Sequence, residues 1–67
     1  MSPLKRMAKR LKTLRAARGW SQADLAERSG VSKVHIARIE TSQREPTLGV
    51  IEKLASALRV KPGALLE

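Results

Sequence analysis

Apolar residues recur at intervals of three and four along the chain, a spacing that predicts amphipathic helices rather than strands. The first apolar stripe consists of Leu4, Met7, Leu11 and Leu14. Ser2 is a suitable N-cap, Pro3 fits the first helical position, and Gly19 ends the pattern just after Arg18. We therefore expect a first helix over about residues 3–18.

Two short helices with clear start signals come next. Ser21 is a suitable N-cap for the second helix, Asp24 lies three residues on in a capping-box position, and Gly30 offers a left-handed exit. Ser32 caps the third helix, which runs to about Glu40. Two helices joined by a tight glycine-containing turn are typical of a helix-turn-helix unit, whose second helix fits the DNA major groove.

The last third of the chain predicts one longer helix and a terminal turn. The helix begins at about Thr47 and ends near Arg59, and Pro62 starts a short turn that carries Leu65 and Leu66. The residues expected to face inward from the longer helix are Leu48, Ile51, Leu54, Ala55 and Leu58. The sequence thus predicts an all-α fold, a compact bundle of four to five short helices that forms a single domain over residues 1–67.

The composition excludes several classes of site. With no cysteine and one histidine, His35, the chain can form neither a disulfide nor a Cys/His zinc site, so we expect no metal and no cofactor. The six acidic residues are scattered and no glycine-rich phosphate loop is present, which argues against an enzyme. A lone aromatic residue, Trp20, argues against a protein that stacks single-stranded nucleic acid.

The charge is strongly asymmetric. Lys and Arg number 14 against 6 Asp and Glu, a net charge of +8, and half of the basic residues precede Gly19. Such a balance favours a polyanionic partner such as nucleic acid, although a solvated basic surface has the same composition. A basic amphipathic first helix also fits a membrane surface, but its narrow apolar stripe favours a globular helix. No apolar run is long enough for a membrane span or a signal peptide, so we expect no membrane partner and a cytoplasmic protein. If it binds DNA, we expect it at the nucleoid when bound.

The third helix has two contrasting faces. On a helical wheel Ile36 and Ile39 fall on one side, while Lys33, Arg38 and the small Ala37 fall on the other. Core packing requires the isoleucines but not the two cations. Taken alone, this pattern favours an ordinary solvated face, and a DNA-reading face is the alternative.

Several motifs taken together resemble a known family. They are Trp20-Ser21-Gln22-Ala23-Asp24-Leu25-Ala26, Gly30-Val31-Ser32, Ile36-Ala37-Arg38-Ile39-Glu40, Arg44-Glu45-Pro46-Thr47-Leu48 and Leu54-Ala55-Ser56-Ala57-Leu58. This pattern is similar to the phage lambda repressor and Cro type of helix-turn-helix, the XRE-like family. The resemblance implies a transcriptional regulator, repressor or controller, that binds double-stranded operator DNA as a homodimer.

The resemblance also implies roles for particular residues. Against base edges it puts Lys33, Val34 and Arg38; against the DNA backbone it puts Gln22, Ser32, His35, Thr41, Gln43 and Arg44. For His35 a partly packed surface position is an equal alternative. Arg15 and Glu40 match positions that form an ion pair between the first and third helices, which we favour over a DNA contact by Arg15. Where the family often has glycine, this chain has Ser42 and Arg59. A positive φ at either position would carry a steric cost that glycine avoids.

Two questions about partners follow. Val50 and Ala57 lie off the inward stripe of the fourth helix, and with Leu66 they could form a modest two-fold dimer patch or be scattered surface hydrophobes. The alternative function is that of an antitoxin-type module, which binds a partner protein and regulates its own gene through the same helix-turn-helix.

Overall fold

Side-chain oxygens cap the first four helices of the computed structural model, which describes residues 2–66. The hydroxyls of Ser2, Ser21, Ser32 and Thr47 each accept a hydrogen bond from the backbone N–H three residues on, at 3.1, 3.0, 3.1 and 3.2 Å. Such caps satisfy backbone donors that have no partner within the helix. The three predicted N-caps, Ser2, Ser21 and Ser32, are confirmed, and Thr47, predicted as the start of the fourth helix, is its N-cap. Residues 1 and 67, the ends of the predicted domain, lie outside the described part.

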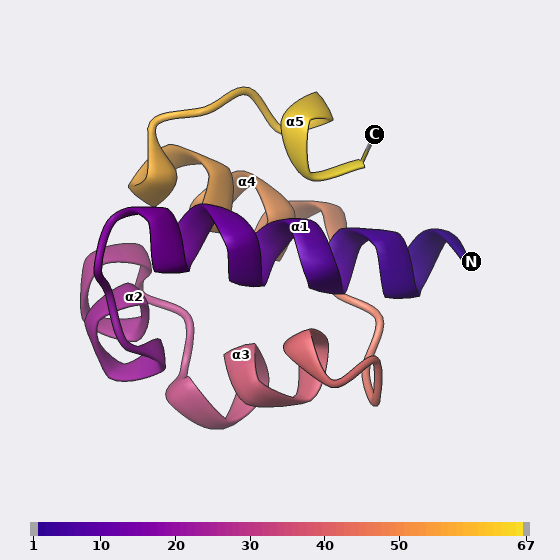
Figure 1. Ribbon diagram of the computed structural model, residues 1–67, viewed down its shortest axis with the longest axis horizontal. Helices are drawn as coiled ribbons and strands as arrows, with labels where there is room; N and C mark the ends of the chain where they lie inside the picture. Colours follow the sequence, from indigo (N-terminus) through magenta and orange to yellow (C-terminus); the bar gives the residue numbers. More distant parts are fainter. Residues whose placement is uncertain (1, 67) are drawn as a thin grey trace.

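Five helices result within the described residues, and there are no strands among them. They are α1 (Pro3–Ala17), α2 (Gln22–Ser29), α3 (Lys33–Glu40), α4 (Leu48–Leu58) and α5 (Gly63–Leu66). In Figure 1, α1 crosses the front of the molecule, with α3 below it and α4 and α5 above it. The predicted all-α bundle is confirmed, and the observed helix bounds differ from the expected ones by about one residue.

The core draws on every helix. The side chains that are at most 1% exposed and largest in volume are Leu11, Leu25, Ile36, Ile39, Leu54, Leu58 and Leu65. From α1, Met7 and Ala8 join Leu11 in the buried set. Because the apolar face of α1 is buried in this core, it is not available to lie in a membrane surface. None of the described helices is long and apolar enough to cross a bilayer.

Two arginines of α1, and a third at its C-cap, fasten this helix to the rest of the bundle. The Nε of Arg10 donates to the carbonyl of Ala64 in α5 at 3.0 Å. Arg18 donates to the Leu58 carbonyl at the end of α4, and Arg15 forms an ion pair with α3. Each guanidinium therefore joins α1 to a different helix.

The prediction that Leu48 lies in the core is wrong. Leu48 is 65% exposed, because it is the first residue of α4 and Cβ atoms tilt toward the helix N-terminus, past the end of the core. Pro46 is buried at this end of the helix instead. Val50 and Ala57, expected to be spare, are partly buried and pack against the core. Of the expected dimer patch, only Leu66, 54% exposed, remains largely open.

Two non-glycine residues adopt positive φ, at both positions where the family resemblance suggested it. Ser42 has φ 60° and Arg59, the C-cap of α4, has φ 56° and ψ 42°. The left-handed conformation lets the amide of Val60 donate to the Ala55 carbonyl at 3.0 Å, which closes the end of the helix. Both turns therefore keep the conformation that glycine usually supplies, at a cost in strain.

We predict that Arg59→Gly stabilises the protein. Relief of about 1–2 kcal/mol of steric strain, less about 0.5–1 kcal/mol for the greater flexibility of the unfolded chain, leaves a gain of about 0.5–1 kcal/mol. Urea unfolding followed by helical circular dichroism measures it. Glu52→Gly, at an exposed position within α4, is the control and should lose about 0.5 kcal/mol. A loss of stability in both variants would contradict the prediction.

Candidate nucleic-acid interface

The α2 and α3 helices form the predicted helix-turn-helix. Gly30 ends α2 in the left-handed conformation at φ 77°, and Val31, 5% exposed, turns into the core. Leu25 of α2 and Ile36 of α3 are fully buried beneath the turn. The angle between the two helices is thus held by apolar packing at the turn itself.

The opposite face of α3 is open to solvent. Lys33 and Arg38 are exposed, and Val34 is 60% exposed, an unusual position for a large aliphatic side chain. Within residues 2–66, no hydrogen bond or ion pair engages the side chain of either cation. Ala37, half-buried between them, leaves room for close approach by a ligand. The structure therefore brings together the three residues that the resemblance implies for base contacts.

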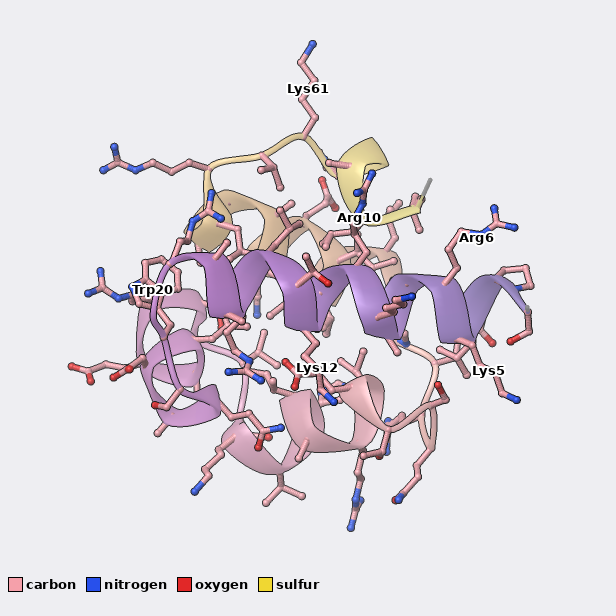
Figure 2. The ribbon with its side chains drawn as sticks, in the orientation of Figure 1. Lys5, Arg6, Arg10, Lys12, Trp20 and Lys61 are labelled. Atoms are coloured by element: carbon pink, nitrogen blue, oxygen red, sulfur yellow. The ribbon has the colours of Figure 1, made fainter. Side chains whose placement is uncertain are left out.

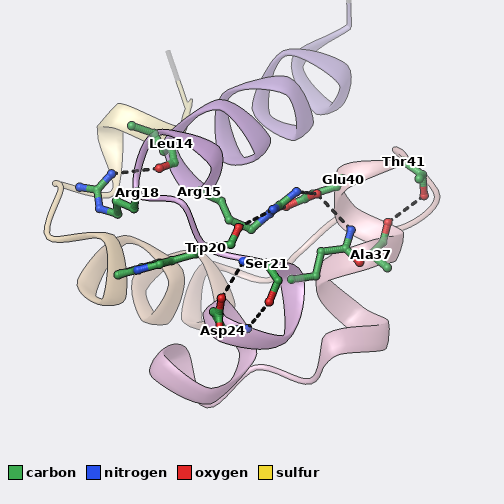
Figure 3. Close-up of polar contacts among 10 residues, drawn as sticks. Leu14, Arg15, Arg18, Trp20, Ser21, Asp24, Ala37, Glu40 and Thr41 are labelled. Carbon is green, nitrogen blue, oxygen red and sulfur yellow. Dashed lines mark hydrogen bonds and ion pairs between the residues drawn. The ribbon is translucent and has the colours of Figure 1, made fainter.

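A buried carboxylate holds α3 in place (Figure 3). Glu40, with its side chain 1% exposed, accepts two hydrogen bonds from Arg15, from Nε at 2.7 Å and from Nη2 at 2.9 Å. The third nitrogen of Arg15 donates to the carbonyl of Trp20 at 2.7 Å, and Gln22 donates to Glu40 at 3.1 Å. The expected ion pair is present, and it links α1, the approach to α2, and α3.

Two pKa values reflect the polar contacts of this region. The hydrogen bonds to Glu40 raise the pKa of Arg15 above its ordinary value, although partial burial opposes the shift. The backbone N–H and hydroxyl of Ser21 lower the pKa of Asp24, completing the capping box in which Ser21 N donates to Asp24 at 2.8 Å. Both groups stay charged at neutral pH.

The residues implied for contacts with the DNA backbone differ in which hydrogen-bond donors they have left for a phosphate. Ser32 uses its oxygen as an acceptor for the His35 amide, so its hydroxyl proton remains available to a phosphate. Gln22 gives one amide hydrogen to Glu40 and keeps a second. Thr41 donates its hydroxyl to the Ala37 carbonyl at 2.9 Å, so a phosphate would have to displace that bond.

His35 and the loop after α3 complete the set. The Nε2 atom of His35 is buried without a hydrogen-bond partner, which places the half-buried ring between core and surface. The side chains of Gln43 and Arg44 are exposed, and the backbone amides of these two residues donate to the Arg38 carbonyl at 2.8 and 3.3 Å. These two bonds fix the path of the loop at the end of α3, where the non-glycine Ser42 has a positive φ.

Sequence reasoning missed some contacts. The bond from Gln22 to Glu40 was not expected, because a polar residue at a helix start has no sequence signal for a partner on another helix. The stacking of Arg28 on Trp20, 4.4 Å from the ring centroid, was also missed. The sequence did hold a sign of this contact, because Trp20, the lone aromatic residue, precedes α2 and the basic Arg28 lies near the end of that helix.

Comparison with known proteins decides the family. Residues 11–65 match HTH_3, the helix-turn-helix family. The chain belongs to this helix-turn-helix family. The XRE-like resemblance drawn from the motifs is thus confirmed.

Similar regulators are found in several bacteria. The chain is 46% identical over 50 residues to the HTH-type transcriptional regulator SutR of Escherichia coli (strain K12), which covers 75% of this chain and 28% of SutR. It is 34% identical over 62 residues to SinR of Bacillus subtilis (strain 168), covering 91% of this chain and 56% of SinR. This helix-turn-helix chain therefore corresponds to only part of the length of these relatives.

Solved structures share the fold over nearly the whole chain. The restriction-modification controller protein C.AhdI from Aeromonas hydrophila superimposes with a TM-score of 0.89 at 40% identity, over 92% of this chain and 94% of that one. The hypothetical transcription factor NHTF from Neisseria gives a TM-score of 0.94 at 30% identity, over 98% and 76%. The bundle is therefore also the fold of a restriction-modification controller.

We predict that Glu40→Ala destabilises the protein by about 3–5 kcal/mol, because it leaves the largely buried Arg15 guanidinium without its counter-charge. Thermal and urea unfolding measure the loss, and Glu45→Ala at an exposed acid should change stability by less than about 0.5 kcal/mol. The double variant Arg15→Ala/Glu40→Ala should be more stable than the sum of the two single losses implies. If the two single losses add up to the loss of the double variant, the ion pair contributes no interaction energy to stability.

Proposed function

We propose that this chain is a sequence-specific DNA-binding transcriptional regulator, a repressor or controller, that reads the major groove with α3. The observation that carries the proposal is the contrast between the two faces of that helix. Ile36 and Ile39 are fully buried, whereas Lys33 and Arg38 are exposed and engaged by no other group of the described chain. A helix with one face locked and the other cationic fits a groove that is lined by acceptors and bordered by phosphates.

The groups around α3 support the same partner. Ser32 and Gln22 each retain a hydrogen for a phosphate oxygen, and Gln43 and Arg44 are exposed beyond the other end of α3. The start of α2 adds unpaired backbone amides and a favourable helix dipole. The names of similar proteins agree: one relative is the immunity repressor protein of Bacillus phage phi105, 32% identical over 60 residues, and one solved structure is a restriction-modification controller.

Selection of bound sites from a random double-stranded library tests the function. We expect enrichment of one sequence, and binding to it should weaken steeply with salt. Contacts to about five phosphates give a log–log slope of about 4 to 5 in magnitude, at about 0.9 for each phosphate. A flat salt dependence, or no binding to any duplex, would rule out the proposal.

Arg38 and Lys33 should set the sequence preference. An arginine favours guanine through O6 and N7, and Val34 favours a thymine methyl group. Arg38→Ala or Lys33→Ala should cost about 1–3 kcal/mol on the selected site and much less on random duplex. Gln22→Ala, at a backbone position, should instead weaken binding equally on both. If Arg38→Ala and Lys33→Ala also lose affinity equally on all sequences, these two residues bind phosphate rather than bases.

We propose that the protein acts on DNA as a two-fold homodimer. Leu66 is exposed beside a shallow hollow lined also by Leu4, Pro46 and Ile51, while Val50 and Ala57 offer only the part of their surface that the core leaves open. Such a dimer places two copies of α3 about 34 Å apart. The selected sites should then be inverted repeats with half-sites about ten base pairs apart. Single half-sites, bound unchanged by Leu66→Glu, would contradict the dimer.

A further inference from the structure

The cations of α1 and its C-cap fall into three groups. Arg10, Arg15 and the C-cap residue Arg18 are committed to α5, α3 and α4 through the contacts described above. Arg6 is exposed. The lysines are exposed, and no hydrogen bond or ion pair of residues 2–66 engages their ammonium groups. We name them the α1 lysine stripe: Lys5, Lys9 and Lys12.

The stripe occupies one face of α1. Residues separated by four and three positions lie on the same side of a helix, and these three span about 10 Å along its axis. In Figure 2, Lys5 and Lys12 extend from α1 on the side of α3, whereas Arg6 and Arg10 extend on the side of α5. No acidic residue precedes Asp24 in the sequence, so nothing on α1 neutralises the stripe.

The height of α1 above α3 brings the stripe near a groove edge. The DNA major groove is about 12 Å wide and 8.5 Å deep, and packed helices lie about 8–10 Å apart. With α3 on the groove floor, the phosphates along the rim therefore stand at about the level of the helix packed on it. Both α1 and α2 pack on α3, and α1 is held there by the bonds between Arg15 and Glu40.

Lysine suits a rim contact. Its ammonium is a hydrated point charge on a flexible stem, so it binds phosphate without the fixed geometry of a guanidinium. A lipid surface fits less well, because the apolar residues of α1, such as Met7 and Leu11, are 6% and 1% exposed and cannot enter a bilayer while the bundle is folded.

We propose that the α1 lysine stripe is a second, sequence-independent DNA contact, which binds phosphates on the rim of the groove that α3 reads. This inference rests on the proposed function. It adds affinity and salt dependence without adding base preference, because phosphates carry no direct sequence information.

The test compares two double variants that remove the same charge from opposite sides. Lys5→Gln/Lys12→Gln removes two cations from the stripe, and Arg6→Gln/Lys61→Gln removes two exposed cations that Figure 2 shows on the far side from α3. On the selected duplex the stripe variant should lower the magnitude of the salt slope by about 1.8, two contacts at about 0.9 each. The far-side variant should leave the slope unchanged, because its side chains extend away from α3 and from the phosphates on that side.

Other outcomes separate the two proposals. If the parent protein binds no duplex, the proposed function fails. If the parent binds with a steep slope and the two variants change it equally, or not at all, the stripe proposal fails while the function stands. The enriched sequence should be the same for the parent and the stripe variant, and an altered sequence would also overturn the proposal. Unchanged helical circular dichroism and unfolding temperature show that both variants are folded.

Discussion

The Arg15–Glu40 ion pair is the contact on which the presentation of α3 depends. A carboxylate whose side chain is 1% exposed is costly to bury, and here two charge-assisted bonds from Arg15 and one from Gln22 compensate for it. Because the same guanidinium also bonds to the Trp20 carbonyl, one side chain fixes the end of α3 relative to α1 and to the start of α2. The direction in which α3 faces solvent therefore depends on a polar contact as much as on the isoleucines beneath it.

Arg10 of α1 and Arg18 at its C-cap connect further helices in the same way. A chain of 67 residues with no disulfide buries little surface, so bonds between helices distant in sequence matter more than they would in a large domain. Arg10 joins residues 54 positions apart and Arg18 joins residues 40 apart. Arginine serves here because its planar group can donate several hydrogen bonds in fixed directions, while the lysines of the same helix stay in water.

Most of the local structure could be predicted from sequence. Ser2, Ser21 and Ser32 cap their helices as expected, and the fourth helix begins beside Thr47 as expected. The left-handed φ at Ser42 and Arg59 was expected from the family pattern. The exposure of Leu48 was not, because helical periodicity assigns a face but not the point where the core ends along the axis. The Gln22–Glu40 bond was missed for a related reason: a wheel describes one helix and says nothing of a neighbour's polar groups.

The sequence by itself determined the helices, their caps, the turn between α2 and α3, and the cationic face of α3, since each depends on residues within a few positions of one another. The sequence also indicated the family through the spacing of its motifs, and the family match over residues 11–65 confirms it. Apart from the Arg15–Glu40 pair, which the family resemblance implied, only the tertiary structure decided which cations are bound and which are free. Arg10 and Arg18 are bound while Lys5 and Lys12 are free because packing between helices distant in sequence decides which acceptors lie opposite each side chain.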